Sequence, residues 1–503
     1  MTKRTLVMTN QLKTLAALTI LATPLAAQTR TTIRISLDDA LRMAVSNSEG
    51  IAVARAGLTR ATGNRMVSRS AGLPQLTGTA SYTKTLKSQF DVFATAPAPD
   101  PTAPKSVCAP QIPDNATPAQ RQAALDAAVT CSSGGGIDFS SAGFGARNQW
   151  ALGLNAGWSV FSGGRISGLN RAAAAQERTA TIEVEAQRAQ TKLDVAQAYY
   201  DAALTDRLVS IAQSSLEQTE RVLQQTKLGK EVGDVSEFDL LRAQVTRDNQ
   251  RPALIQARSN REVAYLRLKQ LLEIPATDSI ALATSLESDS ISPAMSVAAA
   301  TAAQLEAASR APVRQLEQSV IAQEGLLRAA RAERYPQVQL VSGYQRLYFP
   351  NDLFPDFGNA RQNWTVGVQT SFPIFTAGRL RGNTLVAQAN LEETRQRLKQ
   401  TREFTELDTR VAMTQLEEAQ AAYLASAGTA EQAQRALEID QLRYREGIST
   451  QTDLAQSRIL FEQATANRAV ASRNLAVARL RVQLLTDLPL QLGASTTASI
   501  PRQ

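Results

Sequence analysis

Two aspartates, Asp239 and Asp453, occupy equivalent positions in this chain, each near the end of a Gly-x5-Asp-Leu pattern. Each follows a hydroxyl side chain by three residues, Ser236 in the first pattern and Thr450 in the second. A hydroxyl and an acid at this spacing form a variant of the capping box, in which the two side chains close the first turn of a helix. A negative charge there also interacts favourably with the helix dipole. The pattern therefore predicts two tight turns that each lead into a helix.

The residue types on which most enzymes depend are scarce. The chain contains no histidine, which excludes Ser/His and Cys/His nucleophile pairs, the commonest zinc ligand and the usual general base near neutral pH. The sequence also shows no phosphate-binding loop and no dinucleotide-binding fingerprint. We therefore expect no catalytic residues, no cofactor and no metal site, and we do not expect an enzyme.

The N-terminal residues are typical of a secretory signal peptide. Lys3 and Arg4 precede an apolar run, which ends in the small residues Ala26 and Ala27. A charged start, an apolar stretch and small residues before the cut are the parts of such a signal, so cleavage after Ala27 is expected. The alternative is a buried N-terminal helix. The net charge is +8, and Arg, Glu and Gln are interspersed along the chain. This mixed pattern indicates a solvated surface and no nucleic-acid partner.

The two cysteines of the chain, Cys108 and Cys131, predict one disulfide, because an exported chain with a single pair is expected to oxidise it. The bond would enclose 22 intervening residues and constrain the unfolded chain by about 3 kcal/mol. Both cysteines lie in an expected loop insertion, the proline-rich segment 85–147. Whether this segment is a lid or an exposed recognition surface stays open.

The part of the sequence that positions these residues is internally duplicated. Each residue from Trp150 to Pro275 can be matched, without a gap, to the residue 214 positions later, and upstream the offset is 262, so the first copy holds 48 extra residues. A duplication of this length predicts two similar halves in one body, unlike the short repeats of a solenoid. The expected organisation is a signal peptide at 1–27, a first repeat at 28–275, a linker at 276–297, a second repeat at 298–489 and a tail at 490–503.

Each repeat contains two segments that alternate between apolar and polar residues, the pattern of a strand with two different faces. The four strands are expected at about 74–84, 148–161, 336–348 and 362–375. About ten residues is the length that crosses an outer membrane when a strand is tilted. Trp150, Trp158 and Trp364 all lie on the apolar faces, as in the aromatic girdles of membrane strands. A soluble β-sandwich is the alternative, but the small polar residues of the other face fit it poorly.

A helical stretch is expected at 36–69, before the first strand, with Ser36 as a start signal. Long helices follow the strands. They are expected at 166–230 and 379–444, each returning through a tight turn into a helix at 236–272 or 450–485. About 65 residues of helix reach roughly 98 Å, and apolar spacings of three and four predict coiled-coil packing. At the strand-to-helix joints, Gly164 and Gly378 let the backbone change direction, a structural role.

Four strands cannot close a membrane barrel, and unpaired strand edges in lipid are prohibitive, so several chains must share one barrel. The duplication, the Phe-x-Gly-Gly-Arg and Phe-x-Ala-Gly-Arg joints and the repeated turn together resemble the outer-membrane efflux channel family typified by TolC. The resemblance implies a mostly α fold with a membrane β-barrel part. In it, long coiled-coil helices form an α-barrel, and each chain of a homotrimer adds four β-strands to a shared 12-stranded barrel.

The same resemblance implies a passive exit duct in the outer membrane that extends through the periplasm. Its expected partners are outer membrane lipid, a periplasmic membrane-fusion adaptor and an inner-membrane pump of the RND or ABC type, whose docking opens the helical tip. Tripartite efflux and type I secretion are both compatible with it. A periplasmic structural coiled-coil protein without a transport role is the alternative. An ordinary porin is disfavoured because most of the chain is helical, and the cargo is not predicted.

The resemblance also implies a periplasmic gate. Asp453 matches an aspartate that lines the tunnel constriction, while Tyr444 and Asp239 match a pair that helps to hold the tip closed. Two family positions differ here: Gln456 replaces a second constriction aspartate, and Ser449 replaces an arginine of the closing links. These changes imply a closed state that binds cations less or opens more easily. Capping and gating both remain open roles for the aspartates.

The residues at the turns are also candidates for the site where the adaptor docks. This expected adaptor-docking tip comprises Val232, Gly233, Val235, Gly447 and Ile448. Ordinary packing within the turns is the alternative role for the apolar members of this set.

Overall fold

The structure is a computed structural model of the chain, and it describes residues 33–87, 89, 110, 112–132, 146–284, 286, 309–350, 352–355, 358 and 360–490. The expected signal peptide and nearly all of the tail lie outside these residues. The chain divides into two compact units, which we describe separately. Unit 1 comprises Met1–Ser48, Lys192–Met295 and Glu418–Arg479, and unit 2 comprises Glu49–Thr191, Ser296–Glu417 and Leu480–Gln503.

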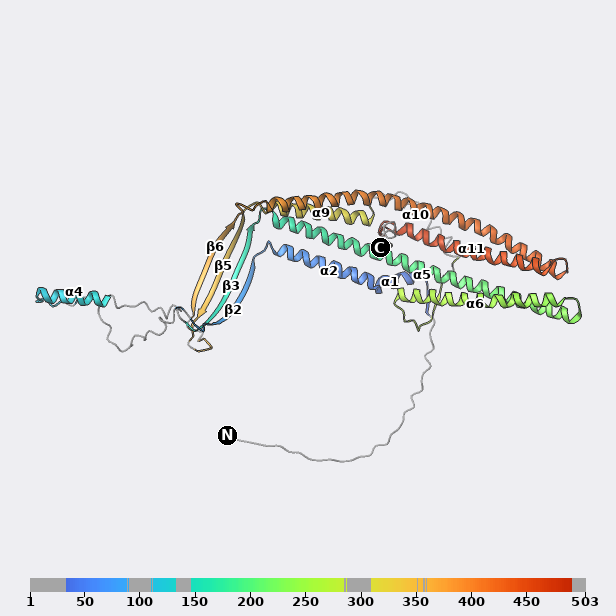
Figure 1. Ribbon diagram of the computed structural model, residues 1–503, viewed down its shortest axis with the longest axis horizontal. Coiled ribbons are helices and arrows are strands. Elements are labelled where there is room, and N and C mark those ends of the chain that lie inside the picture. The colour runs from blue at the N-terminus through green and yellow to red at the C-terminus, as the bar shows by residue number, and fades with distance from the viewer. Residues whose placement is uncertain are drawn as a thin grey trace, which may run out of the picture. The chain divides into compact units, whose positions relative to one another are not determined.

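Unit 2 contains one antiparallel sheet of four strands in the order β2-β3-β5-β6 (Figure 1). The strands are β2 (Gln75–Lys84), β3 (Asn148–Phe161), β5 (Gln337–Tyr348) and β6 (Arg361–Ser371). The β3–β5 pairing joins the first repeat to the second. The two strands of each repeat therefore form a single sheet with those of the other repeat, with β2 and β6 at its edges.

The strand register gathers most of the apolar residues of the four strands on one face of the sheet. One row across the sheet consists of Gly78, Leu154, Tyr344 and Trp364, each opposite the next. Successive side chains of a strand point to opposite faces, so this row continues the apolar alternation expected from the sequence. Leu154 is 48% exposed and Trp364 is 75% exposed. In a single chain, the apolar face is therefore uncovered.

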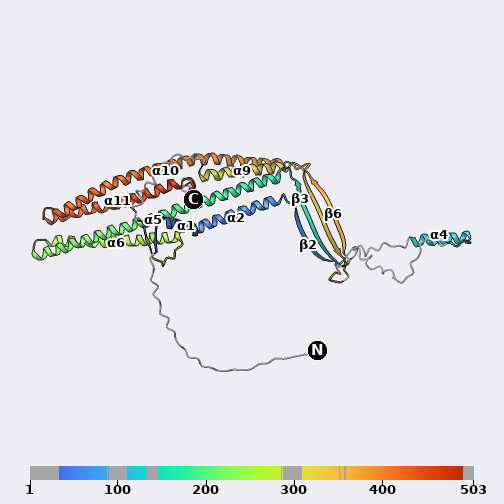
Figure 2. The same cartoon turned by 180° about the vertical axis from the view of Figure 1, so that it is seen from behind.

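Helices α2 (Glu49–Ser70) and α9 (Ala311–Ala332) also belong to unit 2. Both views show α2 alongside the first part of α5 (Arg165–Val232) and α9 alongside α10 (Arg379–Arg445) (Figures 1 and 2). The α5–α9 contact is built from small residues, with Ala172, Ala175 and Ala322 buried together. Alanine and glycine allow the helix backbones to approach closely.

Within unit 2, a buried arginine links α9, α10 and the end of α11. Arg310, the residue before α9, is 0% exposed. It donates to the Asp408 carboxylate on α10 at 2.7 Å and, through Nε, to the Leu485 carbonyl at 2.9 Å, directly after α11 (Gln451–Leu484). Arg481 on α11 donates to the other Asp408 oxygen at 3.2 Å. Burial disfavours the charged form of Arg310 and lowers its pKa, while the Asp408 hydrogen bond opposes this shift.

Unit 1 contains the second part of α5, α6 (Glu237–Leu272), α1 (Leu37–Asn47), the end of α10 and most of α11. Two short parallel strands, β1 (Ile33–Ile35) and β4 (Ile280–Leu282), were not expected from the sequence. The buried Tyr199 hydroxyl on α5 donates to the carbonyl of Ile35 at 3.1 Å and accepts from the Thr284 N–H at 3.3 Å. This side chain therefore fixes both short strands to α5.

Three local expectations differ from the structure. Segment 85–147, expected as a loop, contains helix α4 (Pro118–Ser132). Strand β6, expected to reach 375, ends at Ser371, just before Pro373, which has no N–H for the ladder. The helical stretch 36–69 is two helices, since α1 ends before Ser48 and α2 begins after it. None of the described helices combines the length and apolarity needed to cross a membrane.

The predicted disulfide falls outside what the structure describes. Cys131 lies within α4, and Cys108 is not among the described residues. The disulfide therefore stays a prediction.

Candidate functional site at the two helical turns

The turns α5–α6 and α10–α11 in unit 1 share one backbone design. Gly233 and Gly447 end their helices at φ +86° and +74°, a left-handed conformation that favours glycine. After Gly447, the Ile448 N–H donates to the Arg443 carbonyl at 2.9 Å. In the first turn, the Asp234 N–H donates in the same way to the Gly229 carbonyl at 2.9 Å. This is a Schellman ending, which satisfies carbonyls that the helix itself leaves free. The glycine of each pattern therefore stops one helix so that the next can start.

The aspartate of the second turn caps the helix that follows. Asp453 accepts from the Thr450 hydroxyl at 2.7 Å and from the Thr450 backbone N–H at 3.0 Å, and its own N–H donates to the Thr450 hydroxyl at 3.2 Å. The reciprocal bonds are those of a capping box. The Thr450 hydroxyl, followed by the Thr450 backbone N–H, lowers the pKa of Asp453 below its ordinary value. The exposed carboxylate is therefore stabilised in its charged form.

Asp239 in the first turn makes a similar but smaller set of hydrogen bonds. The Ser236 hydroxyl donates to its carboxylate at 2.6 Å, and the Asp239 N–H donates back to that hydroxyl at 3.1 Å. Both aspartates thus cap helices in the single chain. A capping contact leaves oxygen lone pairs available, so it is compatible with a second role.

Tyr444 lies in a groove between the helical hairpins, and no hydrogen bond joins it to Asp239 among the described residues. The groove is lined by Gln218, Arg221, Val222, Gln225, Gln441, Tyr444, Arg445 and Leu454. The expected closing pair is thus not hydrogen-bonded within this chain, and Tyr444 faces α5 instead.

The apolar residues of the turns differ in exposure. Val232 is 73% exposed and Ile448 is 68% exposed. Val235 is half-buried, and its Cγ2 lies only 2.5 Å from where a Cβ on Gly229 would be, so it packs within the turn. Phe238, one residue before Asp239, is 69% exposed and was not assigned to this surface from the sequence.

The strand-to-helix joints in unit 2 are formed by glycines at positive φ, +94° at Gly164 and +89° at Gly378. The Ser162 hydroxyl accepts from the Ile166 N–H at 3.3 Å and so caps α5. Ala377, before Gly378, also has a positive φ of +47°, which is unfavourable for a residue with a Cβ. These contacts support the structural role expected of the joints.

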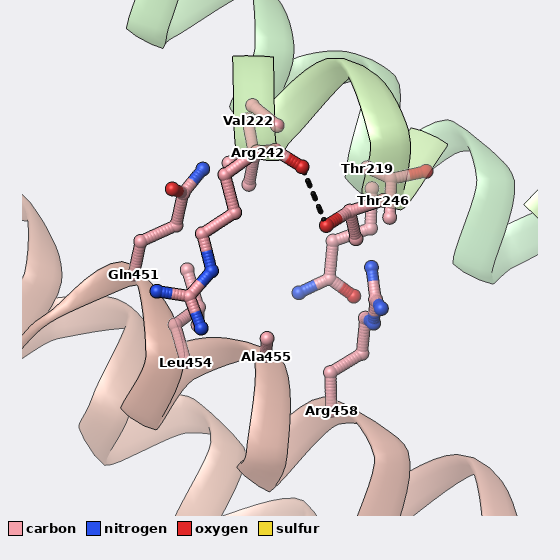
Figure 3. Close-up of a pocket in the computed structure, with 10 residues that line it drawn as sticks. Thr219, Val222, Arg242, Thr246, Gln451, Leu454, Ala455 and Arg458 are labelled. Carbon is pink, nitrogen blue, oxygen red and sulfur yellow. Dashed lines mark hydrogen bonds between the residues drawn. The ribbon is translucent and has the colours of Figure 1, made fainter. Parts of the chain in front are cut away.

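A small cavity of about 30 Å³ lies between α5, α6 and α11, and its lining begins at Gln451, the first residue of α11 (Figure 3). Arg242 from α6 and Arg458 from α11 extend toward the space between these helices (Figure 3). Sequence reasoning missed both arginines. The duplication contained a signal for them, because at each of these two positions only one repeat has an arginine. Arg242 corresponds to Gln456 in the second repeat, and Arg458 corresponds to Gln244 in the first.

Comparison with known proteins identifies the family. Residues 115–273 and 302–486 match the outer membrane efflux protein family, one segment in each repeat. The chain belongs to the outer membrane efflux protein family. Membership places this outer membrane efflux protein in the outer membrane, from which such channels extend into the periplasm. It also argues against the alternative of a periplasmic coiled-coil protein without a membrane part.

Two relatives from Pseudomonas putida are similar in sequence. The chain is 27% identical over 252 residues to a probable efflux pump outer membrane protein, SepC, and equally to the toluene efflux pump outer membrane protein TtgF. Each alignment covers 48% of this chain and 48% of the relative, so the chain matches about half the length of these relatives.

Solved channels share the fold of this outer membrane efflux protein over most of its length. The CmeC outer membrane channel of Campylobacter jejuni is 16% identical, with a TM-score of 0.66 over 90% of this chain and 86% of that chain. The outer membrane protein VceC of Vibrio cholerae is 18% identical, with a TM-score of 0.66 over 90% of this chain and 96% of that chain. The same fold at such low identity confirms the expected TolC-like, mostly helical architecture with internal duplication.

Proposed function

We propose that this protein is the passive outer-membrane exit duct of a tripartite efflux system and that it works as a homotrimer. The observation that carries the proposal is the four-stranded sheet, which has an uncovered apolar face and unpaired edges at β2 and β6. An apolar sheet face is suited to lipid, but unpaired edges in lipid are not tolerated. Edge pairing between copies removes both edges, and three copies give twelve strands, an even number within the range of such barrels.

The helical hairpins of unit 1 then form the periplasmic end of the duct. In a trimer, three Asp453 carboxylates would surround the axis and attract cations, because charges of one sign lining a narrow opening focus the field. The lowered pKa of Asp453 supports this role, since the carboxylate stays charged near neutral pH. Asp239 and Tyr444 would contribute by contacts with neighbouring chains, as both are close to the turns.

The exposed Val232, Phe238 and Ile448 are the proposed docking surface for a periplasmic adaptor. Their exposure leaves apolar area at the turns that an apolar partner surface can cover. An inner-membrane pump, joined through this adaptor, would supply energy and cargo. The match to two efflux pump components favours efflux over type I secretion, and the duct itself would not select the cargo.

The decisive experiment is a mass measurement of the purified full chain in detergent, combined with an export assay. We expect three chains per particle, and we expect loss of drug or solvent resistance when the gene is deleted from its host. A stably folded monomer in detergent would contradict the shared barrel. Retained resistance with loss of protein secretion would contradict efflux while leaving the trimer intact.

A further inference from the structure

One end of the four-stranded sheet carries positive charge that no carboxylate in the strands offsets. Strands β2, β3, β5 and β6 contain three cations, Lys84, Arg346 and Arg361, and no aspartate or glutamate. All three lie toward the strand ends that are not joined to long helices, since β2 and β5 start after helices and β3 and β6 lead into them. The charge is therefore gathered at the sheet end away from the helices.

Arg346 lies within the apolar face of the sheet. The register places it opposite Leu152 on one side and Gln362 on the other, two positions along β5 from Tyr344 of the apolar row described above. Successive residues of a strand point to opposite faces, so Arg361, directly before Gln362, is on the other face. A cation is thus placed among residues suited to lipid.

The contacts of Arg346 within the chain are with tyrosines. Its Nε donates to the Tyr344 hydroxyl at 2.8 Å, and Tyr348 is a second hydrogen-bond partner. Both hydroxyls are neutral, and among the described residues Arg346 forms no ion pair with a carboxylate. A guanidinium group has five N–H donors. The tyrosines therefore fix its position and leave both donors and positive charge for another partner.

The depth of Arg346 in a membrane rests on the proposed function, which brings this face into contact with lipid. Arg346 follows Val338, near the helical end of β5, by eight positions. Eight residues extend roughly 27 Å along a strand, or about 20 Å along the membrane normal at the usual tilt, and the apolar band of such barrels is about 25 Å tall. With the helices on the periplasmic side, Arg346 lies at the outer end of this band, where lipid phosphates begin.

A shallow depression of about 500 Å³ lies beside Arg346. Three strands contribute to its lining, which includes Gly78, Ala80, Leu152, Leu154, Tyr344 and Arg346. A Cβ on Gly78 would meet only Leu154 Cδ2, at 3.8 Å. The small residues of β2 therefore leave room for an apolar chain next to the cation.

We propose that this surface binds a phosphorylated lipid of the outer leaflet, with the phosphate on Arg346 and an acyl chain in the depression. Guanidinium groups bind phosphate through two parallel N–H bonds. The Tyr344 hydroxyl accepts from Arg346 and can donate its own hydrogen to the same phosphate. An acyl chain over Gly78 and Ala80 would gain close van der Waals contacts and cover Leu154, which is 48% exposed.

The competing explanation is an arginine that extends past the membrane surface into water. Two observations favour the lipid. Tyrosines two positions before and two positions after Arg346 hold its guanidinium group against the sheet, and the depression lies next to that group. An arginine that only reaches water would need neither feature and would not prefer one lipid over another.

The test is native mass spectrometry of the full-length protein, purified in a neutral detergent and titrated with diphosphoryl lipid A. We expect lipid A to bind about tenfold or more tighter than a diacylglycerol, which has no phosphate, because hydrogen bonds to charged groups are the stronger ones. Arg346→Gln should lose this preference. Arg361→Gln removes the same charge from an exposed position on the opposite face, so it is the matched control and should keep the preference.

A second pair of variants tests the depression. Gly78→Val places a side chain in it and should reduce the binding of lipid A. Gly157→Val makes the same change on the polar face, where nothing lies within 4 Å of the added Cβ, and should leave binding unchanged. Arg346→Lys covers the case in which the glutamine variant fails to fold, because it keeps the charge and should retain part of the preference.

Three outcomes would overturn the proposal. One is equal affinity for lipid A and diacylglycerol, and another is equal loss of lipid A binding in Arg346→Gln and Arg361→Gln, which would show only a general attraction between charges. The third is displacement of lipid A by an equal concentration of inorganic phosphate, which would show a site for free phosphate.

The same spectra separate this proposal from the proposed function, because they also give the number of chains in each particle. A monomer that binds lipid A through Arg346 would keep the lipid site and contradict the shared barrel. A trimer whose lipid binding does not depend on Arg346 would contradict the lipid site and leave the shared barrel intact.

Discussion

Arg310 and Asp408 form an ion pair inside the helical part of unit 2, with Nη1 and Oδ2 2.7 Å apart and each side chain 1% exposed. The two residues are 98 positions apart in the sequence. Arg310 also donates a hydrogen bond to the Leu485 carbonyl, and Arg481 donates one to the second Asp408 oxygen. One carboxylate thus fixes the start of α9 and the end of α11 against the middle of α10.

The first prediction concerns this pair. Arg310→Met should destabilise the protein by about 3–5 kcal/mol, because it leaves Asp408 buried with a single partner at longer distance. The measurement is unfolding by denaturant in detergent. The double variant Arg310→Met/Asp408→Leu should recover part of the loss, since no unpaired carboxylate remains. Additive effects of the two single changes would show that the pair is not coupled.

The second prediction concerns the closest approach of α5 and α9. A Cβ on Gly168 would lie 2.5 Å from the Gly325 carbonyl oxygen, which is backbone and cannot move aside. Gly168→Ala should therefore destabilise the protein by about 1–3 kcal/mol. Gly382→Ala on α10 is the control, since nothing lies within 4 Å of its added Cβ. It should stabilise by about 0.5–1 kcal/mol, and equal destabilisation by both variants would refute the close-packing argument.

The third prediction separates capping from gating at Asp453. Asp453→Asn keeps much of the capping geometry but removes the charge, so cation preference and block by multivalent cations in planar bilayers should fall. Thr450→Ala removes a cap and keeps the charge, so it should mainly cost stability, by roughly 1 kcal/mol. Thr452→Ala, exposed in the same turn of α11, is the control for both. Unchanged selectivity in Asp453→Asn would leave the aspartate with a capping role alone.

The fourth prediction is the pH dependence of this cap. The pKa of Asp453 is lowered in the folded protein, chiefly by the Thr450 hydroxyl. Its contribution to stability is therefore complete above the ordinary carboxyl pKa and is lost as pH falls through the lowered value. In Thr450→Ala the pKa of Asp453 should rise, so the cation preference should disappear at a higher pH than in the unmodified channel. Identical pH profiles would mean that Thr450 does not set the charge of Asp453.

The fifth prediction is the disulfide between Cys108 and Cys131. Changing both to serine should leave export intact and alter cleavage of segment 85–147 by protease added outside the cell. Alkylation of the unmodified exported protein should find no free thiol. Two reactive thiols would rule out the bond.

Several parts of this protein could be predicted because they depend on residues close together in the chain. Local backbone geometry and the period of the side chains determine three such features. They are the strand alternation around Trp150 and Trp364, the glycines at 233 and 447, and the hydroxyl-acid pair at the start of each return helix. These signals led to strands and long helices close to those observed, and the duplication made each half a check on the other. The helix α4 was missed because its composition shows no apolar stripe to distinguish it from a loop.

Only the tertiary structure decided which distant residues meet. Three contacts bring together residues from different elements: the β3–β5 pairing that joins the repeats, the Arg310–Asp408 ion pair, and the cavity lined by Arg242 and Arg458. Such contacts depend on how whole helices and strands pack, and each arginine in isolation resembles the many solvated arginines of this sequence. Period and turn chemistry are local properties of the chain, whereas burial and charge pairing belong to the packed body.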